Sequence, residues 1–143
     1  MHAWCFCRAS SSRCKNGDAV PDDIPSTEAV GLLTAHATAH RALRQRSNLT
    51  AGETLLVTGA VGGTCLAAIQ IAKAIGAKVI AVCSSEDKLA IAKENGADIL
   101  INSGDGEVKS ATEGKGVDVA YDCVGGELFN VCSIVGIFWR TFT

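Results

Sequence analysis

The chain has 143 residues, enough for one domain with a sizeable core and too few for two domains of ordinary size. Hydrophobic residues make up 48%, charged residues 20%, and the formal net charge is −2, which is typical of a globular α/β protein and excludes a strongly basic nucleic-acid surface. No apolar run is long enough to cross a bilayer, so we expect neither a membrane nor a nucleic-acid partner.

The first 18 residues show no periodicity and carry basic residues and serines with no acidic residue before Asp18. This composition faintly resembles a mitochondrial transit peptide, but no amphipathic helix can be drawn through it. We therefore expect residues 1–18 to be an unstructured leader and the protein to be cytoplasmic rather than mitochondrial. The seven cysteines, odd in number and irregularly spaced, indicate a reducing compartment. Cys5, Cys7 and Cys14 lack the second Cys-x-x-Cys pair typical of a metal site, so we expect no bound metal.

Two short helices are expected before the first strand. Ser26 is a candidate N-cap for a helix from Glu28 to Leu33, and a second helix covers residues 37–46. Strands and helices then alternate, and Gly76 and Gly96 are placed to end two of these helices. The strands are expected at residues 54–58, 78–83, 99–102 and 117–123, and the helices at residues 64–75, 86–95, 107–112 and 127–133.

This alternation predicts an α/β fold, a doubly wound parallel sheet of the Rossmann type. Right-handed crossovers place the strands in the order 3-2-1-4, with a ligand crevice between strands one and four. We expect an incomplete dinucleotide-binding domain at residues 19–133. The later strands of such a sheet are expected to be missing or replaced by the apolar tail at residues 134–143.

A glycine-rich turn joins the first strand to the helix that follows it. A dinucleotide-binding turn places small residues where the backbone turns tightly, where it approaches phosphate and where helix and strand pack closely. Ala60, Gly62 and Cys65 occupy these positions, and we expect Cys65 to weaken the packing without preventing the turn. A P-loop is excluded because no Gly-Lys-Ser or Gly-Lys-Thr follows. A turn that binds no ligand remains the alternative.

The end of the second strand indicates which cofactor is bound. An NAD-binding domain usually has an acidic residue there for the ribose hydroxyls, whereas this chain has Cys83. Ser84 can donate a hydrogen bond to a 2′-phosphate and Lys88 can pair with its charge, which favours NADPH. Glu86 and Asp87, nearby, count against this unless they point away. Simple helix capping by the serines is the alternative interpretation.

Six segments of the chain carry a further signal when taken in order: residues 38–43, 49–57, 59–63, 66–73, 96–98 and 117–126. Together they resemble the cofactor-binding half of the zinc-independent quinone oxidoreductases, the zeta-crystallin-like branch of the medium-chain dehydrogenases/reductases. The resemblance implies an NADPH-dependent enzyme that passes hydride from nicotinamide to a quinone or enone without catalytic zinc.

The resemblance also implies which residues contact the cofactor, and it assigns no catalytic residue to this chain. The pyrophosphate turn would be Ala60, Gly62, Gly63 and Thr64, and the 2′-phosphate contacts would be Ser84 and Lys88. Thr38 would lie near the nicotinamide. Val124 and Gly125, after the fourth strand, would lie near the cofactor.

Some residues depart from the family pattern. Cys65 replaces a glycine, His40 stands where a tyrosine is common, and Ser103 follows the third strand where another tyrosine is usual. His36 and His40 have the i, i+4 spacing of metal ligands, but a third ligand is missing and a plain polar helix face explains them better. Family members are more than twice as long and carry a separate substrate half, so this chain resembles a truncated or decayed gene product.

Four hypotheses therefore remain open. The first hypothesis is that the chain belongs to an NADPH-dependent quinone reductase, although it is expected to be inactive by itself. The second is that it is a non-catalytic NADP(H)-binding fragment, which could pair with a full-length relative. A product without a stable fold is the third hypothesis. A methyltransferase-like domain is the fourth, and the missing acidic residue after the second strand counts against it.

Overall fold

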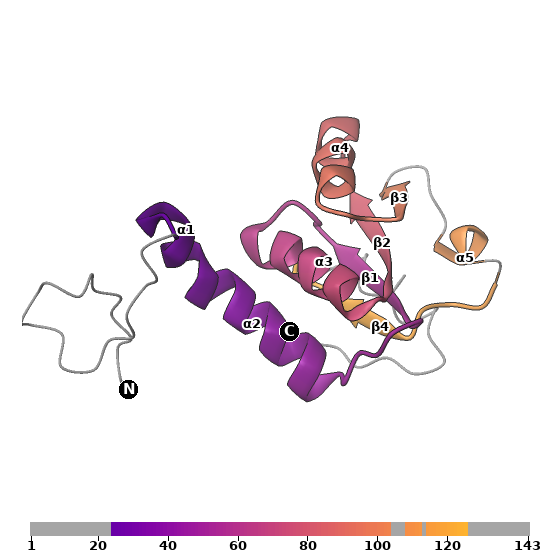
Figure 1. Ribbon diagram of the computed structural model, residues 1–143. Coiled ribbons are helices and arrows are strands. Elements are labelled where there is room, and N and C mark those ends of the chain that lie inside the picture. The colour runs from indigo at the N-terminus through magenta and orange to yellow at the C-terminus, as the bar shows by residue number, and fades with distance from the viewer. Residues whose placement is uncertain (1–23, 104–107, 113, 126–143) are drawn as a thin grey trace, which may run out of the picture.

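The computed structural model describes residues 24–103, 108–112 and 114–125. Within these ranges the chain forms a parallel sheet with helices packed against it (Figure 1). The expected leader, the last helix and the apolar tail lie outside the described residues. None of the helices in the described part of the chain has the length and apolar character needed to span a membrane.

The sheet has four strands: β1 (Thr54–Thr58), β2 (Lys78–Cys83), β3 (Ile99–Asn102) and β4 (Val119–Tyr121). Their order is β3-β2-β1-β4, and every neighbouring pair is parallel, which confirms the predicted topology. In the register, Val57 of β1 lies between Ala81 of β2 and Tyr121 of β4. The inner strands are almost wholly apolar and buried, as a parallel sheet covered on both faces requires.

Helices α3 (Gly63–Ile75) and α4 (Glu86–Glu94) make the crossovers from β1 to β2 and from β2 to β3. Both contribute to the larger apolar cluster, together with the helical segment that precedes β1. The short α5 (Val108–Ala111) contributes Ala111 to a separate cluster with Leu56 and Ile80. The two clusters therefore lie on opposite faces of one sheet.

Helix α3 ends at Gly76, whose φ of +91° fits the left-handed C-cap that the sequence predicted.

The prediction of two separate N-terminal helices was wrong. Residues 26–46 are helical without a break (Figure 1), through α1 (Ser26–Gly31), the π-helical η1 (Leu32–His36), α2 (Ala37–His40) and the π-helical η2 (Arg41–Arg46). The N-cap is Pro25 rather than Ser26. His36, in the expected gap, hydrogen-bonds Oε1 of Gln70 on α3 at 3.0 Å, so packing against α3 keeps this stretch helical.

One strand boundary and one helix cap also differ in detail from expectation. Strand β4 covers three residues instead of the expected 117–123, and Asp122, just after it, accepts a hydrogen bond from the Thr58 hydroxyl. Ser85 occupies the N-cap of α4, as expected, but its side chain makes no capping hydrogen bond. The Ser84 hydroxyl accepts a hydrogen bond from Lys88 Nζ at 3.2 Å instead.

An aspartate fixes each outer strand to its inner neighbour. Asp98, just before β3, accepts a hydrogen bond from the Val79 amide at 2.7 Å, and Asp118, just before β4, accepts one from the Thr54 amide at 2.8 Å. The Asp98 carboxylate also pairs with Lys73 Nζ of α3 at 2.8 Å. These bonds hold the strands in register, so that their carboxyl ends meet along one edge.

Candidate functional site

The candidate site lies at the carboxyl ends of β1 and β4, where the strand order reverses. The chain leaves β1 through Gly59, whose φ is +59°, and a Cβ built on this glycine would lie 2.6 Å from Val124 Cγ2. A glycine is therefore required there, both for the left-handed backbone and for the close approach of the loop after β4. In parallel α/β sheets, ligands bind in the crevice at such a switch point.

Helix α3 begins beside this turn with unsatisfied amides. Its N-cap is Gly62, which has no side chain to cap the helix. Within the described chain, the first helical N–H with an acceptor is that of Leu66, which donates to the Gly62 carbonyl at 2.8 Å. The preceding amides, from Gly63 to Cys65, carry the partial positive charge of the helix N-terminus and favour a bound anion.

Open space surrounds the two glycines at the helix start. Both Gly62 and Gly63 are exposed, and a Cβ built on Gly63 would meet no heavy atom within 4 Å. A Cβ on Gly62 would have its nearest contact at 3.7 Å, with Cys65 Sγ. The fold itself thus does not require glycine at either position, which leaves room for a ligand to approach the backbone.

The other two small positions of the turn are buried. Ala60 is fully buried beneath the turn, and its amide lies 3.5 Å from the Val82 carbonyl of β2. Cys65 is also buried, and its Sγ lies 3.5 Å from the Thr58 carbonyl oxygen. The turn accommodates the sulfur by packing it against the end of β1.

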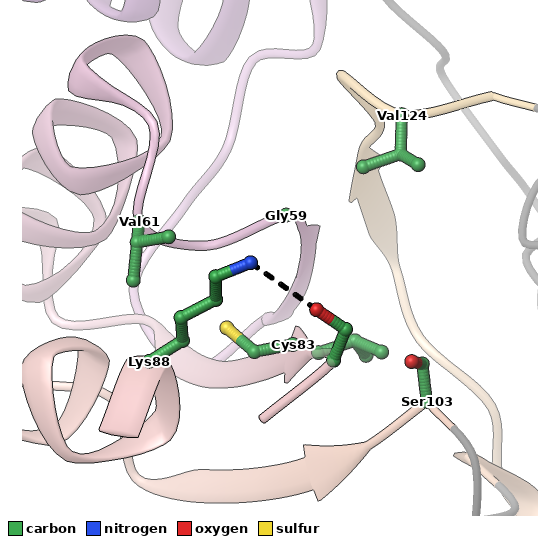
Figure 2. Close-up of a pocket in the computed structure, with 8 residues that line it drawn as sticks. Gly59, Val61, Cys83, Lys88, Ser103 and Val124 are labelled. Carbon is green, nitrogen blue, oxygen red and sulfur yellow. Dashed lines mark hydrogen bonds between the residues drawn. The ribbon is translucent and has the colours of Figure 1, made fainter. Parts of the chain in front are cut away.

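A first cavity of about 310 Å³ opens between the glycine turn and the ends of β2 and β3 (Figure 2). Lys88 extends from α4 across this cavity and donates a hydrogen bond to the Ser84 hydroxyl, drawn as a dashed line in Figure 2. Val124 stands on the opposite side. The lining residues are Gly59, Val61, Val82, Cys83, Ser84, Lys88, Ser103 and Val124.

The charge in this cavity suits an anion. Lys88 is the one charged residue among those that line it. Burial raises the pKa of the Cys83 thiol, so this group at the end of β2 stays neutral. Glu86 accepts a hydrogen bond from Asn102 Nδ2 at 3.2 Å and is not part of the lining. Among the described residues that line the cavity, a phosphate would thus meet an ammonium group and a hydroxyl without an opposing carboxylate.

A second cavity of about 440 Å³ lies on the other side of the turn, toward β4 and the N-terminal helix. Thr38 reaches it from α2 and Thr64 from the first turn of α3. The remaining lining residues are Tyr121, Asp122, Cys123, Val124 and Gly125. Val124 borders both cavities, so the two form adjoining halves of one groove around the start of α3.

Asp122 shapes the loop that separates these halves. Its Oδ1 accepts hydrogen bonds from the Thr58 hydroxyl, the Val124 amide at 3.0 Å and the Gly125 amide at 3.1 Å. Burial alone would raise the pKa of Asp122, but these three donors outweigh it and lower the pKa, so the carboxylate stays ionised. The loop after β4 is thereby tied to the last residue of β1.

The structure distributes the sequence-predicted site residues over distinct places. Ser84, Lys88 and Val124 meet at the first cavity, and Thr38, Thr64, Val124 and Gly125 meet at the second. Gly62 and Gly63 lie exposed at the helix start and line neither cavity, and Ala60 is buried. Cofactor contact by these residues stays a prediction.

Sequence reasoning missed three residues that build the groove. The requirement for glycine is strictest at Gly59, one position before the expected fingerprint. The Thr58–Asp122 pair joins residues 64 positions apart. Its one signal in the sequence is that Thr58 ends one predicted strand and Asp122 lies next to the end of another, since the carboxyl ends of parallel strands meet at one edge.

Comparison with known proteins gives the following similarities. Residues 63–134 match the family described as zinc-binding dehydrogenase. The chain is 37% identical over 126 residues to quinone oxidoreductase-like protein 2 of Rattus norvegicus, an alignment that covers 85% of this chain and 36% of the relative. It thus spans about a third of the length of the curated relatives it matches.

Two solved structures share the fold. A quinone oxidoreductase of Pseudomonas syringae pv. Tomato DC3000 superposes with a TM-score of 0.77 at 33% identity, covering 82% of this chain and 38% of that one. A mycobacterial protein solved in complex with NADPH superposes with a TM-score of 0.76 at 32% identity, with the same coverage.

Proposed function

Because this chain belongs to the zinc-binding dehydrogenase family and is similar over most of its length to quinone oxidoreductases, we propose that it binds NADPH in the groove around the start of α3. The observation that carries the proposal is the uncapped N-terminus of α3 at the strand-order switch point, flanked by two adjoining cavities. The pyrophosphate would bind the amides of Gly63 and Thr64.

The two ends of the cofactor would occupy different cavities. Lys88 and Ser84 would hold the 2′-phosphate, since the described residues that line the first cavity include a cation and no carboxylate. Thr38, Thr64 and Gly125 would position the nicotinamide in the second cavity. When bound, NADPH would supply the hydride. The residues of this chain would bind the cofactor, orient its nicotinamide ring and shield one side of that ring.

The acceptor that we propose is a quinone or an enone, a small molecule that takes hydride directly from the nicotinamide. This part of the proposal rests on the similarity to quinone oxidoreductases. The family description names zinc, but in the described ranges no three His, Cys, Asp or Glu side chains come together as a metal site would need. We therefore assign no step to a metal.

Thermal unfolding with NADPH, NADH and S-adenosylmethionine tests the proposal. A ligand at a hundred times its Kd adds about 2.7 kcal/mol to the free energy of unfolding, and the melting temperature should rise most with NADPH. A rise with S-adenosylmethionine alone would instead support a methyltransferase-like domain. The absence of a rise with any nucleotide would contradict the proposal.

The variant Gly62→Val locates the cofactor. At φ −66° and ψ 149° the backbone of Gly62 accepts any residue, and its surroundings leave space for a Cβ, so the variant should fold. The added isopropyl group would exclude a phosphate from the α3 amides, and the NADPH-induced rise should disappear. Gly31→Val is the matched control, because a Cβ at Gly31 also meets open space, in α1. An unchanged rise in Gly62→Val would place the cofactor elsewhere.

A further inference from the structure

Two cysteines flank the last residue of β1 beside the glycine turn. Cys65, in the first turn of α3, is buried, and its Sγ lies 3.5 Å from the Thr58 carbonyl oxygen. Cys123, just after β4, is exposed, and its amide donates to the Thr58 hydroxyl at 3.3 Å. Residues far apart in the sequence are thus held against the same threonine.

The two side chains approach one another. Cys123 Sγ lies 4.0 Å from Oγ1 of Thr64, the residue that precedes Cys65 in the chain. Burial and the adjacent Cys123 thiol raise the pKa of Cys65 to about 12, so Cys65 is a neutral thiol at physiological pH. The accessible group of the pair is therefore Cys123.

We propose that Cys65 and Cys123 form an oxidation site, at which a peroxide converts the two thiols into a disulfide that blocks the groove around the start of α3. The bond would join the first turn of α3 to the loop that Asp122 ties to β1. It would draw Cys123 onto the amides that face the groove.

The chemistry balances with one peroxide. The Cys123 sulfur, as its thiolate, attacks a peroxide oxygen; the S–O bond forms, the O–O bond breaks, and hydroxide leaves and is protonated to water for hydrogen peroxide. The Cys65 sulfur then attacks the resulting sulfenic acid. The S–S bond forms, the S–O bond breaks, and the hydroxyl leaves as water with the Cys65 proton. Two thiols and one hydrogen peroxide thus give one disulfide and two waters.

Peptide mapping after treatment with hydrogen peroxide tests the linkage in the full chain. Trypsin separates residues 47–73, which hold Cys65, from residues 116–140, which hold Cys123 and Cys132, so every variant carries Cys132→Ser. We expect these two peptides to be joined by a bond that dithiothreitol cleaves. A link from Cys65 to Cys83, or oxygen addition at Cys123 without a link, would overturn the proposal.

The effect on the groove is measured separately, as NADPH affinity before and after oxidation of each variant. This part rests on the proposed function, whereas the mapped linkage does not. Oxidation should weaken NADPH binding at least tenfold, reversibly, in the parent. In Cys65→Ala and in Cys123→Ser, the ratio of oxidised to reduced affinity should stay near one. If the oxidised parent contains the disulfide and still binds NADPH with unchanged affinity, the proposed blocking of the groove is wrong. If the reduced parent binds no NADPH, the proposed function is wrong, while the mapped disulfide still stands.

Discussion

Gly59 is the residue on which the shape of the turn depends most. With φ at +59°, any other residue strains the backbone, and a Cβ would press against Val124 Cγ2. The Gly59→Ala variant should lose about 1–2 kcal/mol of unfolding free energy from the backbone alone. Urea unfolding of Gly59→Ala and of the double variant Gly59→Ala/Val124→Ala separates backbone strain from the steric contact. Only the steric contact is relieved when Val124 is also replaced by alanine.

The matched control for this prediction is Gly62→Ala. It lies in the same turn at a negative φ with its nearest contact at 3.7 Å, so its unfolding free energy should change much less. Equal losses in Gly59→Ala and Gly62→Ala would show that the left-handed backbone is not the cause.

Lys88 is the residue that should distinguish NADPH from NADH. The Lys88→Ala variant removes the ammonium group of the first cavity, and the loss of one charge-assisted hydrogen bond to a phosphate should weaken NADPH binding about tenfold. NADH binding should change little, since NADH has no 2′-phosphate. Isothermal titration with both nucleotides measures this, with Lys93→Ala, on the same helix, as control. Equal losses for the two nucleotides would rule out the phosphate role.

At the scale of elements, local patterns predicted most of the sheet. The bounds of β1, β2 and β3 follow directly from apolar runs ended by turn residues. The continuous N-terminal helix could not be predicted in this way, because its middle is held by a contact with α3, 34 residues away. The glycine turn and the Ser84–Lys88 pair were also local patterns, whereas the Thr58–Asp122 bond depends on how β4 pairs with β1.

The bond between Asp98 and its neighbours couples β3 to acid stability. Burial alone would raise the pKa of Asp98, but the Lys73 ammonium and the Val79 amide lower it. The pKa of Asp98 is lower in the folded state than in the unfolded state. The ionised carboxylate therefore stabilises the fold at any pH above its unfolded-state pKa, and this stabilisation is lost as the pH falls through its folded-state pKa. Both side chains are about one-third exposed, so about 0.5–1 kcal/mol is expected.

Urea unfolding at pH 6 and pH 3 of Asp98→Asn and Lys73→Met checks this. Each variant should lose less stability between the two pH values than the parent does, and the double variant should resemble the single ones, because they remove the same ion pair. Acid sensitivity equal to that of the parent in both variants would contradict the assignment.

At the scale of the whole molecule, cofactor binding and turnover should separate. The chain spans about a third of the length of its curated relatives. Hydride transfer needs a second wall that orients the acceptor and excludes water. We predict that the 143-residue chain gains thermal stability with NADPH but oxidises no NADPH when a quinone is added. Quinone-dependent loss of NADPH absorbance, above that of Gly62→Val, would show that this chain is an active reductase.

Val124 gives the groove a property that neither cavity has alone. Its isopropyl group forms part of the wall on both sides, and it is held against Gly59 by the loop after β4. A ligand group that displaces the Val124 side chain from one cavity would reduce the volume of the other. Binding of the adenine end of a dinucleotide would thus affect the space left for its nicotinamide end through this one side chain.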